Sequence, residues 1–144
     1  MNATAYDVDI VAWSEEQARL LRSGRLDALD VEHIAEEIED MGKSEQRELA
    51  SRMAVFLAHL LKWQYQPERR CNSWRRTIVA QRKEIEYHLA EAPSSKTKLD
   101  DPRWFDVVWA KALAQAVSET GMDVFPEVCP WSADEVLGME FWPE

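Results

Sequence analysis

The apolar residues between Val31 and Tyr65 keep one helical phase throughout, and this constrains the fold more than any other feature of the chain. Asp30 suits the N-cap position before this segment. Pro67 disfavours helical geometry at the residue before it and so marks the end. At 100° per residue, the following side chains fall within an arc of roughly 100°, the width of a core-facing stripe: Ile34, Ile38, Met41, Leu49, Phe56, Leu60 and Trp63. The pattern predicts one long central helix over about residues 31–65.

The segment Gly42-Lys43-Ser44 is the weak point of this interpretation. A glycine inside a helix costs about 1 kcal/mol relative to alanine, and Ser44 could cap a new helix. Two nearly collinear helices are therefore the alternative. The maintained phase favours a single helix.

Further helices are expected on both sides of the long one. We expect a first helix over Tyr6–Ser23, or one that begins at Ser14, followed by Gly24. A third helix, capped by Asn72 or Ser73, should run to about Glu91. The remaining expected elements are a turn over residues 96–100, a fourth helix from Asp101-Pro102 to Thr120, and a short helix over Ala133–Leu137 capped by Ser132 and Glu135.

The loops and the tail are too apolar to remain free in solvent. We expect Leu26 and Leu29 to close one end of the core. Most of the 7 tryptophans should be buried, because large aromatic side chains bury much area. The tail should dock on the helical body, or on a partner, through Phe125, Trp131, Phe141 and Trp142. The predicted fold is all-α, a helical bundle with a docked aromatic C-terminal tail.

Composition limits the classes of function. A chain of 144 residues with 46% hydrophobic residues predicts a single helical domain over residues 1–144. The net charge of −10 argues against general nucleic-acid binding and against an anionic membrane surface. No apolar run reaches the length of a membrane span. We therefore expect a cytoplasmic protein whose two cysteines are free thiols.

Three ionisable residues share the apolar face of the long helix. Glu45, Arg52 and His59 are spaced seven residues apart. Charged groups that face a core are costly unless they are paired. The row therefore forms a satisfied polar seam against another helix, or it lines a pocket, and the seam is the preferred interpretation.

The stretch from Arg69 to Lys83 holds six basic residues and no acidic one. Nucleic-acid binding is the obvious hypothesis for such a stretch. Charge balance is preferred, because the start of the long helix is strongly acidic and a neighbouring basic helix would offset it. Exposed ion pairs of this kind stabilise by roughly 0–1 kcal/mol each.

Short motifs follow one another along nearly the whole chain, from about Tyr6 to Pro143. They are Tyr6-Asp7 with Asp9 and Trp13, Leu29-Asp30, Ile34-Ala35-Glu36-Glu37-Ile38-Glu39-Asp40-Met41-Gly42, His59-Leu60-Leu61-Lys62-Trp63-Gln64-Tyr65-Gln66-Pro67-Glu68, Ser73-Trp74 with Ile78, Gln81-Arg82, Glu119-Thr120-Gly121, Phe125-Pro126 and Cys129-Pro130. In this order they resemble a bacterial family of uncharacterised proteins, the domain of unknown function 29. Ala35 and the alanine-rich stretch from Val107 to Ala116 depart mildly from the family pattern.

The resemblance implies an all-helical bacterial protein and no established activity. It points to positions in the recurring motifs: Glu36, Glu37, His59, Lys62, Trp63, Trp74 and Arg82. The polar members fall where a charged seam between the long helix and the third helix is expected. Glu37 and Arg82 could equally form a buried pair that fixes helix register.

These observations favour a non-enzymatic protein-binding or adaptor module with an unknown protein partner. Homo-oligomerisation is left open, and the sequence predicts no cofactor, no metal site and no assigned catalytic residue. The alternative is a small-ligand-binding protein or enzyme that uses the seam, whose candidate residues are Glu36, Glu37, Glu45, Arg52, His59, Lys62, Trp74 and Arg82. A third and disfavoured hypothesis is nucleic-acid binding through Arg69–Lys83.

Overall fold

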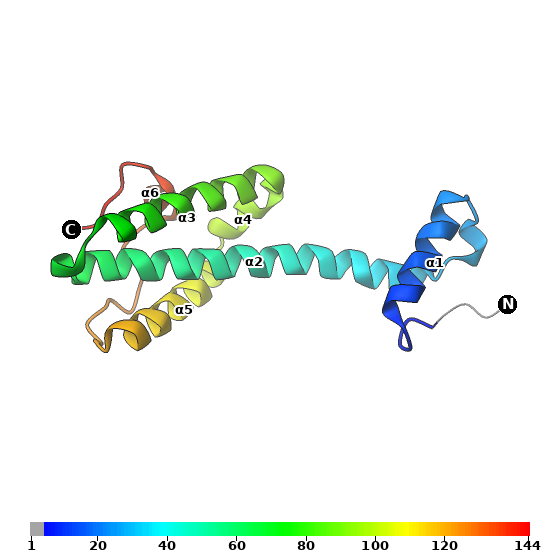
Figure 1. Cartoon of the computed structure of the whole chain (residues 1–144), viewed down its shortest axis with the longest axis horizontal. Coiled ribbons are helices and arrows are strands. Elements are labelled where there is room, and N and C mark those ends of the chain that lie inside the picture. Colours follow the sequence, from blue (N-terminus) through cyan, green and yellow to red (C-terminus); the bar gives the residue numbers. More distant parts are fainter. Residues whose placement is uncertain (1–4) are drawn as a thin grey trace. The chain divides into compact units, whose positions relative to one another are not determined.

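The computed structural model describes residues 5–144, and all regular elements in that range are helical (Figure 1). The elements are α1 (Ile10–Arg22), η1 (Leu26–Ala28), α2 (Val31–Tyr65), η2 (Pro67–Arg69), α3 (Asn72–Glu91), η3 (Pro93–Ser95), α4 (Lys96–Leu99), α5 (Pro102–Thr120) and α6 (Ala133–Leu137), where η denotes a 3-10 helix. The all-α prediction is confirmed. The single long helix is confirmed as well, because α2 continues through Gly42.

Several helix ends coincide with the capping residues that the sequence predicts. The Asp101 carboxylate accepts a hydrogen bond from the backbone N–H of Arg103 at 3.0 Å, at the start of α5. Gly121 follows α5 with a φ of 72°, a left-handed conformation that favours glycine. Ser132 and Glu135 form the expected capping box at α6.

Two helix starts differ from the prediction. The first helix begins at Ile10, between the two predicted starts at Tyr6 and Ser14. Asp9 sets this start, because its carboxylate accepts a hydrogen bond from a backbone N–H in the first turn at 3.1 Å. Asn72, predicted as a cap, is instead the first helical residue of α3.

The chain divides into two compact units, Met1–Glu45 and Gln46–Glu144, and α2 contributes residues to both. In the second, C-terminal unit, α3 and α5 lie on opposite sides of α2 (Figure 1). Side chains on more than half of the circumference of α2 are buried there, because helices pack on opposite sides of it. The α2 members of this core are Leu49, Met53, Ala54, Phe56, Leu57, Ala58, Leu60, Leu61 and Trp63.

The aromatic tail docks on the body of the C-terminal unit, as predicted. Trp142 packs on Trp63 with ring centroids 4.8 Å apart, and Trp131 meets Trp109 edge to face at 5.8 Å. The Trp109 indole Nε1–H donates to the backbone carbonyl of Pro126 at 3.1 Å. These contacts bury apolar rings and satisfy a buried donor.

Burial of the tryptophans follows the prediction only in part. Trp13, Trp63 and Trp109 are buried. The other four are half-buried and pack against the core at its edge: Trp74, Trp104, Trp131 and Trp142.

The N-terminal unit contains α1, η1 and the first turns of α2, and few side chains are buried among its residues 5–45: Trp13, Gln17 and Leu20. The predicted stripe of α2 is not buried in this unit, since Ile38 is 62% exposed and Met41 is 67% exposed. The expectation that the stripe faces a core along its whole length is therefore wrong here. The expectation that Leu26 closes a core is also wrong, because 62% of this residue is exposed.

None of the described helices combines the length and the apolar content that a bilayer crossing requires.

Candidate functional site

His59 and Lys62 lie half-buried towards the end of α2, and their partners differ. His59 Nδ1 is 2.9 Å from the carbonyl oxygen of Val55 in the same helix, and burial lowers the pKa of His59 below its ordinary value. Lys62 Nζ is 3.3 Å from a Glu119 carboxylate oxygen on α5 and lies 5.3 Å from the centroid of the Trp74 ring on α3. Lys62 therefore links three helices of the C-terminal unit.

Arg52 forms ion pairs on the surface of the C-terminal unit. Its Nη2 is 2.8 Å from Glu48 of the same helix, and its Nη1 is 3.0 Å from Glu84 of α3. The guanidinium lowers the pKa of Glu48 by a hydrogen bond and by its charge. Arg52 and Glu84 also line a hollow of about 220 Å³. Glu45 is exposed and is the last residue of the N-terminal unit.

Arg82 is completely buried, and backbone carbonyls of the tail are its hydrogen-bond acceptors. Its Nε donates to the carbonyl of Val136 at 2.9 Å, and its Nη2 donates to the carbonyl of Phe141. The guanidinium lies 5.0 Å from the ring centroid of Trp142 and 5.6 Å from that of Phe56. Burial lowers the pKa of Arg82. Arg82 thus anchors the C-terminal tail to α3.

Other basic residues of the Arg69–Lys83 stretch have similar structural roles. Arg70 Nε donates to the carbonyl of Trp63 at 2.7 Å, and Arg75 lies 4.7 Å from the ring centroid of Trp142. Three of the six basic residues are therefore engaged with backbone carbonyls or aromatic rings. Their interactions differ from the predicted charge balance with carboxylates of the long helix.

Asp30 organises a polar network in the N-terminal unit that the sequence did not predict. Its Oδ2 accepts a hydrogen bond from Trp13 Nε1 at 2.9 Å and lies 2.7 Å from His33 Nδ1. Its backbone N–H donates to Gln17 Oε1 at 2.8 Å. The hydrogen bonds from His33 and Trp13 lower the pKa of Asp30, and the hydrogen bond to Asp30 raises the pKa of His33.

Tyr6 joins this network to a predicted site residue. Its ring stacks on His33 with centroids 4.2 Å apart, and its hydroxyl donates a hydrogen bond to the Glu37 carboxylate. That hydrogen bond raises the pKa of Tyr6 to about 12. Glu37 and Arg82 thus have different partners, which disfavours the alternative in which they form a buried pair. Glu36 is exposed.

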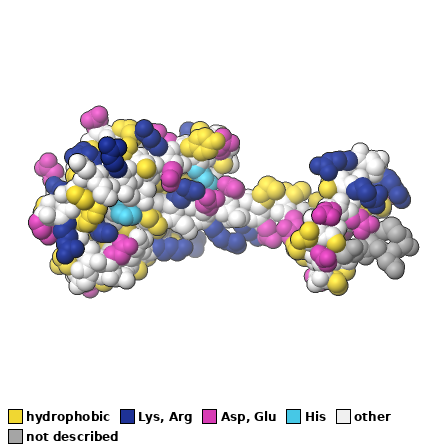
Figure 2. Space-filling model, viewed as in Figure 1, with side chains coloured by type: hydrophobic (Ala, Val, Ile, Leu, Met, Phe, Trp, Pro, Cys, Tyr) yellow, Lys and Arg dark blue, Asp and Glu magenta, His cyan; other side chains and the backbone are white. Residues whose placement is uncertain are grey.

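An open groove of about 510 Å³ lies beside the network, between α1 and the first turns of α2. Apolar and acidic side chains are mixed on part of the visible surface of the N-terminal unit, and basic side chains gather on another part (Figure 2). The groove is lined by Trp13, Ser14, Gln17, Ala18, Leu21, Ile34, Glu37, Ile38, Asp40, Met41 and Ser44. It therefore presents apolar side chains and carboxylates and no basic side chain.

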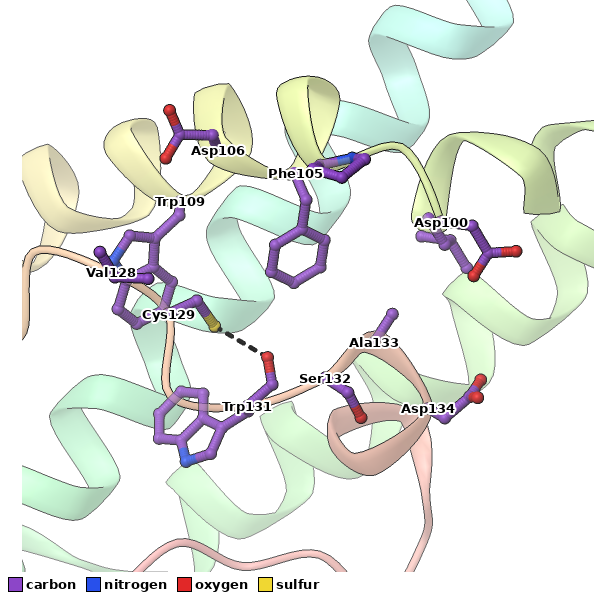
Figure 3. Close-up of a pocket in the computed structure, with 12 residues that line it drawn as sticks. Asp100, Phe105, Asp106, Trp109, Val128, Cys129, Trp131, Ser132, Ala133 and Asp134 are labelled. Atoms are coloured by element: carbon purple, nitrogen blue, oxygen red, sulfur yellow. Dashed lines mark hydrogen bonds between the residues drawn. The ribbon is translucent and has the colours of Figure 1, made fainter.

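A second concave surface lies in the C-terminal unit, where α4, α5 and the loop before α6 meet. Its volume is about 340 Å³, and aromatic rings and carboxylates line it (Figure 3). The sequence analysis assigned its aromatic residues to packing. Its aspartates lie at the end of α4, on α5 and on α6, so no local pattern indicated that they share a pocket.

The fold and these sites define an all-helical protein with concave surfaces in both of its compact units. The chain belongs to the family described as Domain of unknown function DUF29, which matches residues 5–142. An alpha-helical protein of unknown function from Rhodospirillum rubrum ATCC 11170 has a similar structure, with a TM-score of 0.64 and 28% sequence identity over 97% of this chain and 93% of that chain. Comparison with curated proteins finds no match.

Proposed function

We propose that the protein is a non-enzymatic binding module whose N-terminal unit receives a basic, amphipathic helix from a partner protein. The observation that carries the proposal is the groove between α1 and α2. Ile34, Ile38 and Met41 are spaced at i, i+4 and i+7 and line one side of it. This is the spacing by which one helix face packs along another helix.

The apolar residues of the groove form a contiguous surface. Leu21 of α1 is 49% exposed and lines the same groove as Ile38 and Met41 of α2. Single exposed apolar residues are normal on protein surfaces, whereas a contiguous patch is typical of an interaction site. Covering these side chains would supply the hydrophobic part of the binding free energy.

Charge selects the partner. Residues 1–45 contain 12 acidic and 4 basic side chains, a net charge of −8 out of the −10 of the whole chain. Glu37 and Asp40 line the groove itself. A basic helix would be attracted to this surface, and its association rate would rise at low salt. The same unit of a second copy would be repelled.

The other two hypotheses have less support. Of the predicted seam residues, Arg52 and Lys62 are paired with carboxylates, and His59 bonds to its own helix. Of the basic stretch, Arg70 donates to the backbone carbonyl of Trp63 on α2, and Arg82 donates to that of Val136 in the tail. A cytoplasmic location stays a prediction.

The test is a titration of the whole protein with a synthetic helical peptide of Lys and Leu, and with its counterpart in which Glu replaces each Lys. The basic peptide should bind and the acidic one should not. The double variant Ile38→Ser with Met41→Ser should weaken binding at least about tenfold, because burying an apolar side chain contributes about 1.5–3 kcal/mol. Both residues are exposed, so the fold tolerates the change.

The matched control is the double variant Val107→Ser with Val124→Ser, two residues of the C-terminal unit that are 58% and 64% exposed. It should bind the basic peptide like the wild type. Equal binding by the groove variant, or equal binding of the acidic peptide, refutes the proposal. Self-association of the wild type that the groove variant abolishes would make a second copy the occupant and also refute it.

A further inference from the structure

The pocket of the C-terminal unit has an apolar, aromatic wall. Phe105 and Trp109 of α5 line it together with Trp131, which meets Trp109 edge to face. Phe105 extends from α5 into the space beside α6 (Figure 3). A volume of about 340 Å³ lies within the range of small-molecule sites, which are concave, mostly apolar and supplied with a few polar groups.

The charged groups of this pocket are all carboxylates. Asp100, Asp106 and Asp134 line it, and no Lys, Arg or His is among its lining residues. Asp100 and Asp134 lie on the same side of the pocket, beyond Phe105, whereas Asp106 lies on the other side of α5 (Figure 3). One end of the pocket is therefore aromatic and the other is anionic.

We infer that this pocket binds a small amphipathic organic cation, an amine or quaternary ammonium carried by an apolar body. The ammonium group would lie near Asp100 and Asp134, and the apolar body would contact Phe105 and Trp131. The carboxylates attract the ammonium group by their charge, and the aromatic rings bury the apolar body. The inference is independent of the groove in the N-terminal unit.

The pocket offers an anionic ligand few favourable contacts. The N-terminus of α5 is at the pocket, but Asp101 already caps it by accepting the N–H of Arg103. Additional carboxylates at the opening repel an anion.

Covalent chemistry through the pocket cysteine is also disfavoured. Cys129 Sγ donates to the carbonyl of Trp131 at 3.3 Å, and burial raises the pKa of the thiol to about 11. The thiolate is the nucleophilic form, so a thiol that stays protonated at neutral pH is unreactive. The state of Cys129 therefore favours non-covalent binding in this pocket over nucleophilic attack by the thiol.

The test compares three probes that have similar apolar bodies and different charges: 2-phenylethylamine, 2-phenylethanol and phenylacetate. Each is titrated into the whole ¹⁵N-labelled protein at constant ionic strength. The indole N–H signal of Trp131, assigned with Trp131→Phe, reports binding. The amine should give a saturable shift at a lower concentration than the alcohol, and phenylacetate should bind most weakly.

Two sets of variants test the assignment of the two ends. The double variant Asp100→Asn with Asp134→Asn should weaken amine binding about fivefold or more and remove the preference over the alcohol. Phe105→Ala removes the ring that contacts the apolar body and should weaken the amine and the alcohol alike. Asp123→Asn, an exposed carboxylate outside the pocket, is the control and should bind like the wild type.

Each contrary result overturns the inference. Absence of saturable binding by all three probes excludes a small-ligand site of this kind. Alcohol or phenylacetate binding as tight as that of the amine excludes a cation site. Unchanged amine binding in the Asp100/Asp134 double variant excludes the assigned carboxylates. The other indole signals report whether each variant is folded.

Discussion

Replacing Arg82 by methionine should destabilise the protein by releasing its tail. The side chain is buried, and its guanidinium donates to the backbone carbonyls of Val136 and Phe141. Methionine keeps an unbranched apolar stem of similar reach, so packing is largely retained. The main loss is that of the two hydrogen bonds.

The magnitude is a balance of opposing effects. Hydrogen bonds to a charged group contribute about 1.5–3 kcal/mol each, and each buried carbonyl left without a donor costs about 1–3 kcal/mol. Removing a buried charge is favourable in itself, because its desolvation cost disappears. The acceptors here are backbone carbonyls that a substitution at Arg82 cannot remove, so the loss should prevail at about 2–4 kcal/mol. Undocking of the tail, which would hydrate these carbonyls, sets the upper limit.

Urea denaturation of Arg82→Met and wild type measures the free energy of unfolding, and hydrogen exchange of residues 133–142 measures docking of the tail. Arg76→Met is the matched control, since Arg76 is exposed on the same helix and should change stability by no more than about 0.5 kcal/mol. Wild-type stability of Arg82→Met with a protected tail would refute the reasoning. It would mean that the desolvation cost of the charge equals what its hydrogen bonds contribute.

Two further predictions concern pH and glycine. By NMR titration, His33 should titrate above its ordinary pKa of 6.5 because of Asp30, and His59 should titrate below it because of burial. The substitution Asp30→Asn should remove the upward shift of the His33 pKa and leave the pKa of His59 unchanged. Because the pKa of His33 is raised in the folded state, its contribution to stability is complete below pH 6.5 and is lost as the pH rises through the folded-state pKa. Because the pKa of Asp30 is lowered, its contribution is present above the ordinary pKa of 3.8 and is lost as the pH falls through the folded-state pKa. Stabilisation by the pair should therefore be complete between about pH 4 and 6.5, and titration of His33 at or below 6.5 would contradict the hydrogen bond. In thermal unfolding, Gly121→Ala should destabilise by about 1 kcal/mol because φ is 72°, whereas Gly42→Ala inside exposed α2 should stabilise by up to about 1 kcal/mol. Equal effects of the two substitutions would refute this.

The helices themselves could be predicted because their determinants are local. Asp101, Gly121 and the Ser132/Glu135 box act on backbone groups within a few residues, so their types and spacing are sufficient to mark helix ends. The phase of the apolar residues along α2 is also a property of the chain alone. This phase correctly predicted that the helix continues through Gly42, although the low helix propensity of glycine favoured a break there.

The sites depended on the tertiary structure, because their members are distant in the sequence. Trp13 and Asp30 are 17 residues apart, and Arg82 and Val136 are 54 apart. Several partners were available to each of these side chains, and packing selected backbone carbonyls for Arg82 where the sequence suggested Glu37. The pocket around Asp100 and Asp134 combines residues from separate elements in the same way.

The apolar stripe of α2 shows which features the sequence determined and which the tertiary structure decided. The sequence by itself determined which side chains share a helix face, since the helix repeat fixes their direction. The tertiary structure alone decided that Phe56 and Leu60 are buried, while Ile38 and Met41 are exposed. Burial depends on what lies opposite a face, and an amphipathic pattern is the same for a core as for a binding surface.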